Sequence, residues 1–133
     1  MEYISSGANV WIDYMVIDRL EYPFRLPYKY IMNEDSICDE LLSPKGIKKK
    51  LIELGLTGTE LTEKEFYYAL DIIPRYPKLS EYDRAALSIA KHRNIVLLSG
   101  DTALRKAAIS EGVTVIGTIG ILDKLFERQL ITR

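Results

Sequence analysis

The stretch from Leu79 to Ala108 constrains the fold more than any other part of the sequence. It contains a helical pattern after Ser80, a continuous apolar run from Ile95 to Leu98, and a Gly-Asp turn that opens a second helical pattern. A short apolar run without alternation is typical of a strand buried on both faces of a parallel sheet. Helix, buried strand and helix in this order predict a parallel sheet covered by helices.

The same alternation extends along the rest of the chain. Strand patterns occur at residues 2–5, 28–32, 56–61, 95–98 and 113–116. Helical patterns lie between them and after the last one, at residues 9–20, 33–42, 47–54, 62–73, 80–90, 102–111 and 122–130. We therefore expect one α/β domain over residues 1–133, with a doubly wound, mostly parallel five-stranded sheet in a three-layer α/β/α arrangement.

Charge and composition narrow the function classes. The chain has 18 Lys and Arg residues against 19 Asp and Glu residues, a formal net charge of −1. A protein that binds nucleic acid by charge alone is usually basic, so contact with phosphate here needs a local patch or a metal ion. No apolar run is long enough to span a bilayer, and the N-terminus has no secretory pattern. The lone Cys38 cannot form an internal disulfide, which favours a cytoplasmic location.

Three acidic residues stand at the ends of predicted elements, and local structure explains each of them alone. Asp83 lies three residues after the N-cap candidate Ser80, where an acid is favourable to the helix dipole. Asp101 is placed to cap the helix that follows it. Glu40 adjoins an apolar pair, which is typical of a solvated helix face. Acids at the carboxyl end of parallel strands also lie where open α/β sheets bind ligands.

Four segments taken together resemble the PIN domain family, and in particular the toxin ribonucleases of the VapC type in prokaryotic toxin–antitoxin pairs. They are ANVWID (8–13), DELL (39–42), LSEYDRAAL (79–87) and LLSGDTALRKAA (97–108), the last followed by VTVIGTIGIL (113–122). The resemblance covers nearly the whole chain in order and spacing. It implies a PIN-like fold with a cluster of acids that holds Mg²⁺ or Mn²⁺.

The resemblance assigns the acids of this cluster one by one. The second, third and fourth acids of the family match Glu40, Asp83 and Asp101, which the resemblance makes catalytic and metal-binding. The first acid stands two residues before the position of Asn9, and here that position is Gly7. Neighbouring carboxylates repel and raise one another's pKa, so a cluster of them is unfavourable without a bound cation. A carboxylate missing from the cluster removes one negative charge and one metal ligand. We therefore expect weak metal binding and impaired cleavage.

Gly7 has three interpretations. The first is a natural degenerate position that leaves a binding-only protein. The second is a substitution, deliberate or selected, because an active ribonuclease toxin harms the host that produces it. The third is a different alignment, in which Asp13 takes the role of the first acid. Asp13 is the least favoured, because it falls in the middle of the predicted helix, more than a turn beyond the strand. Asn9 is a candidate to bind a metal-bound water, although its expected N-cap role alone explains it.

Basic residues supply weaker candidates. Arg105 follows Asp101 by four positions, so it lies one helical turn away. It is placed to contact a phosphate or to neutralise the charge of the acids. A solvent-exposed arginine on the helix surface is the simpler interpretation. Lys48, Lys49 and Lys50 are candidates for contact with an RNA backbone, or form a solvent-facing stripe. We give His92 no catalytic role.

Two functions follow from the resemblance. The first is a metal-dependent endoribonuclease of the toxin type, impaired because Gly7 occupies the first carboxylate position; it implies an RNA substrate, a cognate antitoxin and a homodimer. The second is a catalytically inactive PIN-like domain that binds protein or RNA. A receiver-like signalling domain ranks low, because it needs an acidic pair after the first strand and a lysine after a late one.

Overall fold

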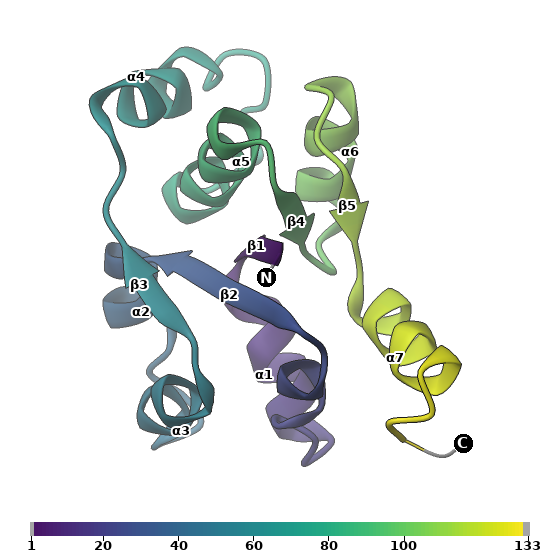
Figure 1. Cartoon of the computed structure of the whole chain (residues 1–133). Coiled ribbons are helices and arrows are strands. Elements are labelled where there is room, and N and C mark those ends of the chain that lie inside the picture. The colour runs from purple at the N-terminus through teal and green to yellow at the C-terminus, as the bar shows by residue number, and fades with distance from the viewer. Residues whose placement is uncertain (1, 132–133) are drawn as a thin grey trace.

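Five strands form one sheet in the order β3-β2-β1-β4-β5, and all four neighbouring pairs are parallel (Figure 1). The computed structural model describes residues 2–131 of the chain. The central strand β1 pairs with β2 on one side and with β4 on the other. The strands are β1 (Glu2–Ser6), β2 (Tyr28–Asn33), β3 (Thr57–Thr59), β4 (Val96–Leu98) and β5 (Val115–Ile116).

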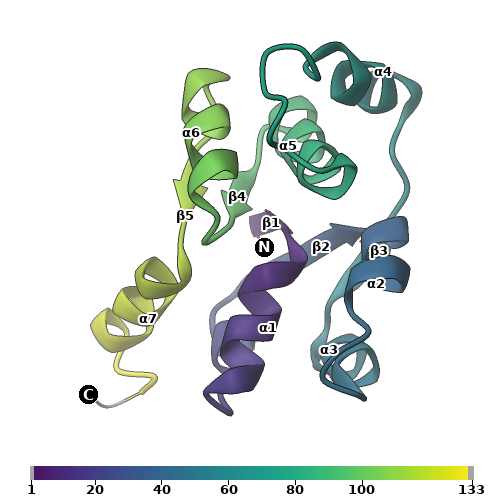
Figure 2. The same cartoon turned by 180° about the vertical axis from the view of Figure 1, so that it is seen from behind.

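Helices cover both faces of this sheet, as Figures 1 and 2 show from opposite sides. One face carries α1 (Ala8–Val16), α2 (Glu34–Glu40), α3 (Ile47–Leu54) and α7 (Thr118–Glu127), with a short 3₁₀ helix, η1 (Tyr22–Arg25). The other face carries α4 (Glu63–Asp71), α5 (Glu81–Arg93) and α6 (Thr102–Ser110). The predicted three-layer α/β/α architecture is confirmed, with a sheet that is entirely parallel. None of the described helices is both long and apolar enough to cross a membrane.

An aromatic cluster fixes the end of β1 against α1. The Trp11 ring stacks on Phe24 at 5.3 Å between centroids and meets Tyr30 edge-on at 5.2 Å. The indole Nε1 of Trp11 donates a hydrogen bond of 2.9 Å to Ser6 Oγ at the last position of β1. Trp11 and Tyr30 are fully buried, so this packing holds the junction at Gly7 in place.

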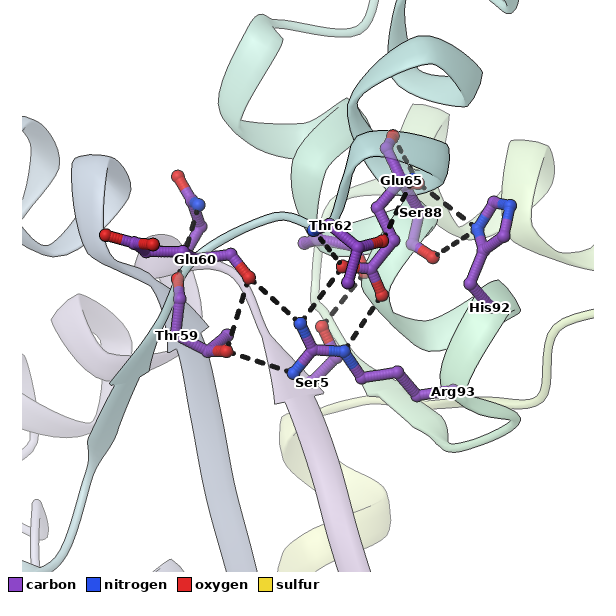
Figure 3. A network of polar contacts seen from close by, with 10 residues as sticks. Ser5, Thr59, Glu60, Thr62, Glu65, Ser88, His92 and Arg93 are labelled. Atoms are coloured by element: carbon purple, nitrogen blue, oxygen red, sulfur yellow. Dashed lines mark hydrogen bonds and ion pairs between the residues drawn. The ribbon is translucent and has the colours of Figure 1, made fainter.

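A polar network joins α4 to α5 on the opposite face (Figure 3). Glu65, only 1% exposed, accepts hydrogen bonds from Arg93 Nε at 2.9 Å and Nη2 at 3.0 Å. Arg93 also donates to Thr59 Oγ1, at the end of β3, at 3.0 Å. Thr62 and Glu65 form a capping box at the start of α4, and this Glu65 is the same buried carboxylate. This network sets the position of α5, whose first turn carries Asp83.

The element boundaries differ from the sequence pattern at a few places. Helix α1 begins at Ala8 rather than Asn9, because Gly7 is its N-cap in an extended conformation; Asn9 is therefore not the N-cap. The same helix ends at Val16, ahead of Asp18, which has a positive φ of 56°. The third strand is only three residues long.

Candidate acidic site

The predicted acids lie around the carboxyl ends of the central strand β1 and its neighbour β4. Strands β1 and β4 are neighbours, yet the chain leaves β1 toward β2 and leaves β4 toward β5. Such a change of direction opens a crevice at the sheet edge, where α/β proteins bind ligands. Gly7 follows β1 and Asp101 lies three residues beyond β4, and the Gly7 N–H donates to the Leu98 carbonyl at 3.4 Å.

Asp101 is held at the start of α6 by its capping role. Its Oδ2 accepts a 2.8 Å hydrogen bond from the Leu104 N–H, as the sequence predicted. Its own N–H donates to Ser99 Oγ at 3.1 Å, which fixes the turn after β4. One carboxylate oxygen is occupied by the cap, so the second oxygen is the one available to a ligand.

Asp83 lies in the first turn of α5, at the same edge of the sheet. Its N–H donates to the Ser80 Oγ cap at 3.1 Å, again as predicted. Burial raises the pKa of this carboxyl, and the charge of Asp101 raises it further, while hydrogen bonds with Ser80 act in the opposite direction. The charge of Asp101 acts on Asp83 although the two acids are eighteen positions apart in sequence, so the fold brings them near each other.

Glu40 joins the same group from the last position of α2. Its pKa is raised to about 7, first by burial and then by the charges of Asp83 and Asp39. The Tyr82 hydroxyl donates to Asp39 Oδ2 at 2.7 Å and so ties the end of α2 to the start of α5. This hydrogen bond could not be predicted from the sequence, because the spacing of Asp39 and Tyr82 does not show that their helices meet.

The three acids are thus electrostatically linked, with Glu40 coupled to Asp83 and Asp83 to Asp101. Their carboxylate oxygens are the donors that Mg²⁺ and Mn²⁺ prefer. Within residues 2–131, however, no three acidic, histidine or cysteine side chains lie close enough together to hold one ion. The carboxylates present are the type of ligand that a hard divalent cation prefers, but too few of them lie close together to hold one.

Position 7 offers space for a side chain. A Cβ atom on Gly7 would meet no other heavy atom within 4 Å, and the backbone has φ −88° and ψ 172°, which any residue adopts. An N-cap is also a preferred position for Asp. The fold therefore does not require glycine here.

The weaker candidates lie around or away from this edge. Asn9 is exposed in the first turn of α1. Lys49 and Lys50 are exposed and Lys48 half-buried on α3, which lies apart from α5 and α6 in both views (Figures 1 and 2). Phosphate contact by these lysines stays a prediction. Arg105 is exposed on α6 beside the start of α7.

Glu40→Gln is expected to flatten the pH dependence of stability. Because the folded pKa is raised from 4.5 to about 7, the folded protein keeps a proton that the unfolded chain has released. Stability therefore falls as pH rises between these values, and glutamine removes that loss while keeping the side-chain shape. Urea unfolding of parent and variant at both ends of the window measures the difference. An equal loss in both proteins would show that Glu40 does not have a raised pKa.

Comparison with known families decides the classification. The DUF3368 family model, described as a PIN domain, matches residues 6–133 and so spans Gly7 and all three acids. The chain belongs to the PIN domain family. A search of curated proteins found no match for this PIN domain.

Two solved structures share the fold of this PIN domain. One is a PilT N-terminus domain protein, SSO1118, from the hyperthermophilic archaeon Sulfolobus solfataricus P2, with a TM-score of 0.69 and 17% identity over 93% of this chain and 92% of that one. The other is PAE2754 from Pyrobaculum aerophilum, with a TM-score of 0.61 and 14% identity over 96% and 98% of the two chains. These identities establish similarity of fold.

Proposed function

We propose that this PIN domain is a metal-dependent endoribonuclease that is impaired because Gly7 stands in place of the first acid. One observation carries the proposal: Asp83 in the first turn of α5 and Asp101 at the start of α6 lie at the edge of the sheet where the chain changes direction between β1 and β4, and the hydrogen bond from Tyr82 to Asp39 brings the end of α2, with Glu40, to the start of α5. Two of the three acids have raised pKa values. Neighbouring carboxylates that raise one another's pKa are favoured by a nearby cation, which supports a role for these acids in cation binding once position 7 also carries a carboxylate.

The roles of the three acids follow from how they are held. The Asp101 carboxylate is oriented by the hydrogen bond that it accepts from the Leu104 N–H. Asp83 lies in the first turn of α5, where hydrogen bonds with Ser80 lower the pKa of its carboxyl. Together with Glu40 and a carboxylate at position 7, they would hold Mg²⁺ or Mn²⁺, which when bound supplies an activated water and neutralises phosphate charge. With Gly7 present, we expect weak binding of the ion.

Finer parts of the proposal rest on the resemblance to VapC-type toxins. They are a cytoplasmic location, a role in a toxin–antitoxin pair, a cognate antitoxin that blocks the site, and a homodimer. Gly7 is then a substitution that removes a harmful activity.

A second candidate function has a specific observation in its favour. The position that the family fills with its first acid has no side chain, and the space around it is open. A catalytically inactive PIN domain that binds RNA or protein fits this observation as well as an impaired nuclease does.

Cleavage of a labelled RNA in the presence of Mn²⁺ tests the proposal. The parent, Gly7→Asp and Gly7→Asp/Asp101→Asn proteins are compared side by side. Cleavage that appears with Gly7→Asp and is lost again with Asp101→Asn supports the nuclease. No cleavage by any of them favours the binding module.

A further inference from the structure

A fully buried serine joins the central strand β1 to α5. Ser5 lies two positions before Gly7 in the chain. Side chains alternate along a strand, so Ser5 faces α5, whereas Ile4 and Ser6 face the side of α1. The Ser5 Oγ donates a hydrogen bond of 2.9 Å to the Ala86 carbonyl, 81 positions away in sequence. The end of the central strand is therefore fixed to α5 by a polar contact.

The surroundings of the Ser5 hydroxyl are apolar. Leu97 on β4 is paired with Ser5, and Leu97 and Ala86 belong to one buried hydrophobic cluster on this face of the sheet. An apolar side chain at position 5 would need no partner, and strands buried on both faces usually carry one. A buried hydroxyl must be hydrogen-bonded, and a satisfied buried pair restricts how the strand and the helix lie against each other.

This hydrogen bond acts on the part of α5 that carries Asp83. Ala86 follows Asp83 by three positions, so the two residues lie one helical turn apart on the same face. Tyr82, which precedes Asp83, extends the connection to the end of α2 through its hydrogen bond to Asp39. A shift of the first turn of α5 therefore moves Asp83, and with it the end of α2, relative to the end of β1.

Other polar contacts of α5 act further along the helix (Figure 3). The Ser88 Oγ donates a hydrogen bond of 2.7 Å to the Glu65 carbonyl on α4, and it lies 3.3 Å from His92 Nδ1. Arg93, at the last position of α5, contacts Glu65 and Thr59. These contacts fix α5 against α4 and β3, and the Ser5 contact fixes it against β1.

We propose that Ser5 is a positioning residue of the acidic site, whose hydrogen bond to the Ala86 carbonyl sets where Asp83 stands relative to position 7. Asp83 and Asp101 repel each other when both are ionised, and the contact from Ser5 opposes the displacement that this repulsion favours. Functional side chains must be held within about 0.5 Å of their working positions. The inference rests on the proposed function, because a shared ligand is what makes the relative position of these acids matter.

Crystal structures of metal-free variants test the geometry. Ser5→Ala removes the hydroxyl and keeps the rest of the side chain. Ser88→Ala is the matched control, because Ser88 is equally buried and also donates to a main-chain carbonyl. After superposition on the sheet, the first turn of α5 should move by more than about 0.5 Å in Ser5→Ala and by less in Ser88→Ala. An unmoved first turn in Ser5→Ala would overturn the inference.

Binding of Mn²⁺ measures the consequence for the site. The electron paramagnetic resonance signal of free Mn²⁺ follows binding in the Gly7→Asp background, where position 7 carries a carboxylate. Adding Ser5→Ala should weaken binding by roughly tenfold, as residues that orient metal ligands do, and Ser88→Ala by less than about twofold. Both should lower the urea midpoint by similar amounts, which separates positioning from stability. Ser5→Cys, similar in size but a weaker donor, should be intermediate.

The outcomes distinguish the role of Ser5 from the proposed function. Equal losses of Mn²⁺ affinity in Ser5→Ala and Ser88→Ala would make Ser5 a purely structural residue. Binding of Mn²⁺ by Gly7→Asp that Ser5→Ala leaves unchanged would keep the proposed function and overturn the positioning role. If Gly7→Asp binds no Mn²⁺ while α5 still moves in Ser5→Ala, Ser5 positions Asp83 and the metal-dependent function is wrong.

Discussion

Gly7→Asp is expected to raise the Mn²⁺-dependent rate of RNA cleavage by at least about 100-fold, the size of effect that metal-site residues typically have. The added carboxylate would stand at the end of β1, next to the strand that leads to Asp101. It enters open space in a backbone conformation that is normal for aspartate, so the fold need not change. Rates with and without Mn²⁺ give the effect directly.

Gly7→Asn is the matched control for this gain. Asparagine has almost the same shape and caps a helix about as well as aspartate, so it reproduces any gain in helix stability. It lacks the charge that a divalent cation requires. Equal activity in the Asn and Asp variants would mean that the change acts through the start of α1 and not through metal binding.

Arg93→Ala is expected to lower the free energy of unfolding by about 3 kcal/mol or more at neutral pH. The substitution leaves Glu65 buried without its cationic partner and removes a donor to Thr59. Burial alone would raise the pKa of Glu65, but the hydrogen bonds from Arg93 and Thr62 outweigh it and lower that pKa. Urea unfolding of the parent and the variant measures the loss.

The pH dependence of that loss identifies its cause. Since the pKa of Glu65 is depressed in the folded protein, its stabilisation is present above about pH 4.5 and declines as pH falls through the folded value. The difference between parent and Arg93→Ala should therefore shrink in acid. A Glu65→Ala/Arg93→Ala double variant should also lose less than the sum of the single variants, because neither charge is left buried alone. A loss independent of pH would point to packing by the Arg93 stem instead.

Local sequence signals predicted the parts of the site that depend on local structure. Ser80 and Asp101 cap the helices that their positions indicate. Strand and helix alternation predicted a parallel sheet because buried parallel strands leave a continuous apolar run. These features depend on neighbours within a few residues along the chain.

Long-range features could not be predicted in the same way. The effect of the Asp83 charge on the pKa of Glu40 requires that α2 lies against α5. The hydrogen bond between Tyr82 and Asp39 joins residues that are 43 positions apart in sequence. The Gly7 N–H, at the N-cap of α1, donates a hydrogen bond to the Leu98 carbonyl in a neighbouring strand, a contact that no local sequence pattern indicates.

Position 7 and the three acids form, on the function proposed for this PIN domain, one metal-binding site. Anomalous diffraction from crystals of the Gly7→Asp protein soaked in Mn²⁺ tests this most directly. We predict a single strong Mn²⁺ peak at the carboxyl ends of β1 and β4, within coordination distance of the carboxylate introduced at position 7 and of Asp101, with Glu40 and Asp83 turned toward it. A Mn²⁺ peak elsewhere, or none beside these carboxylates, would contradict the proposal.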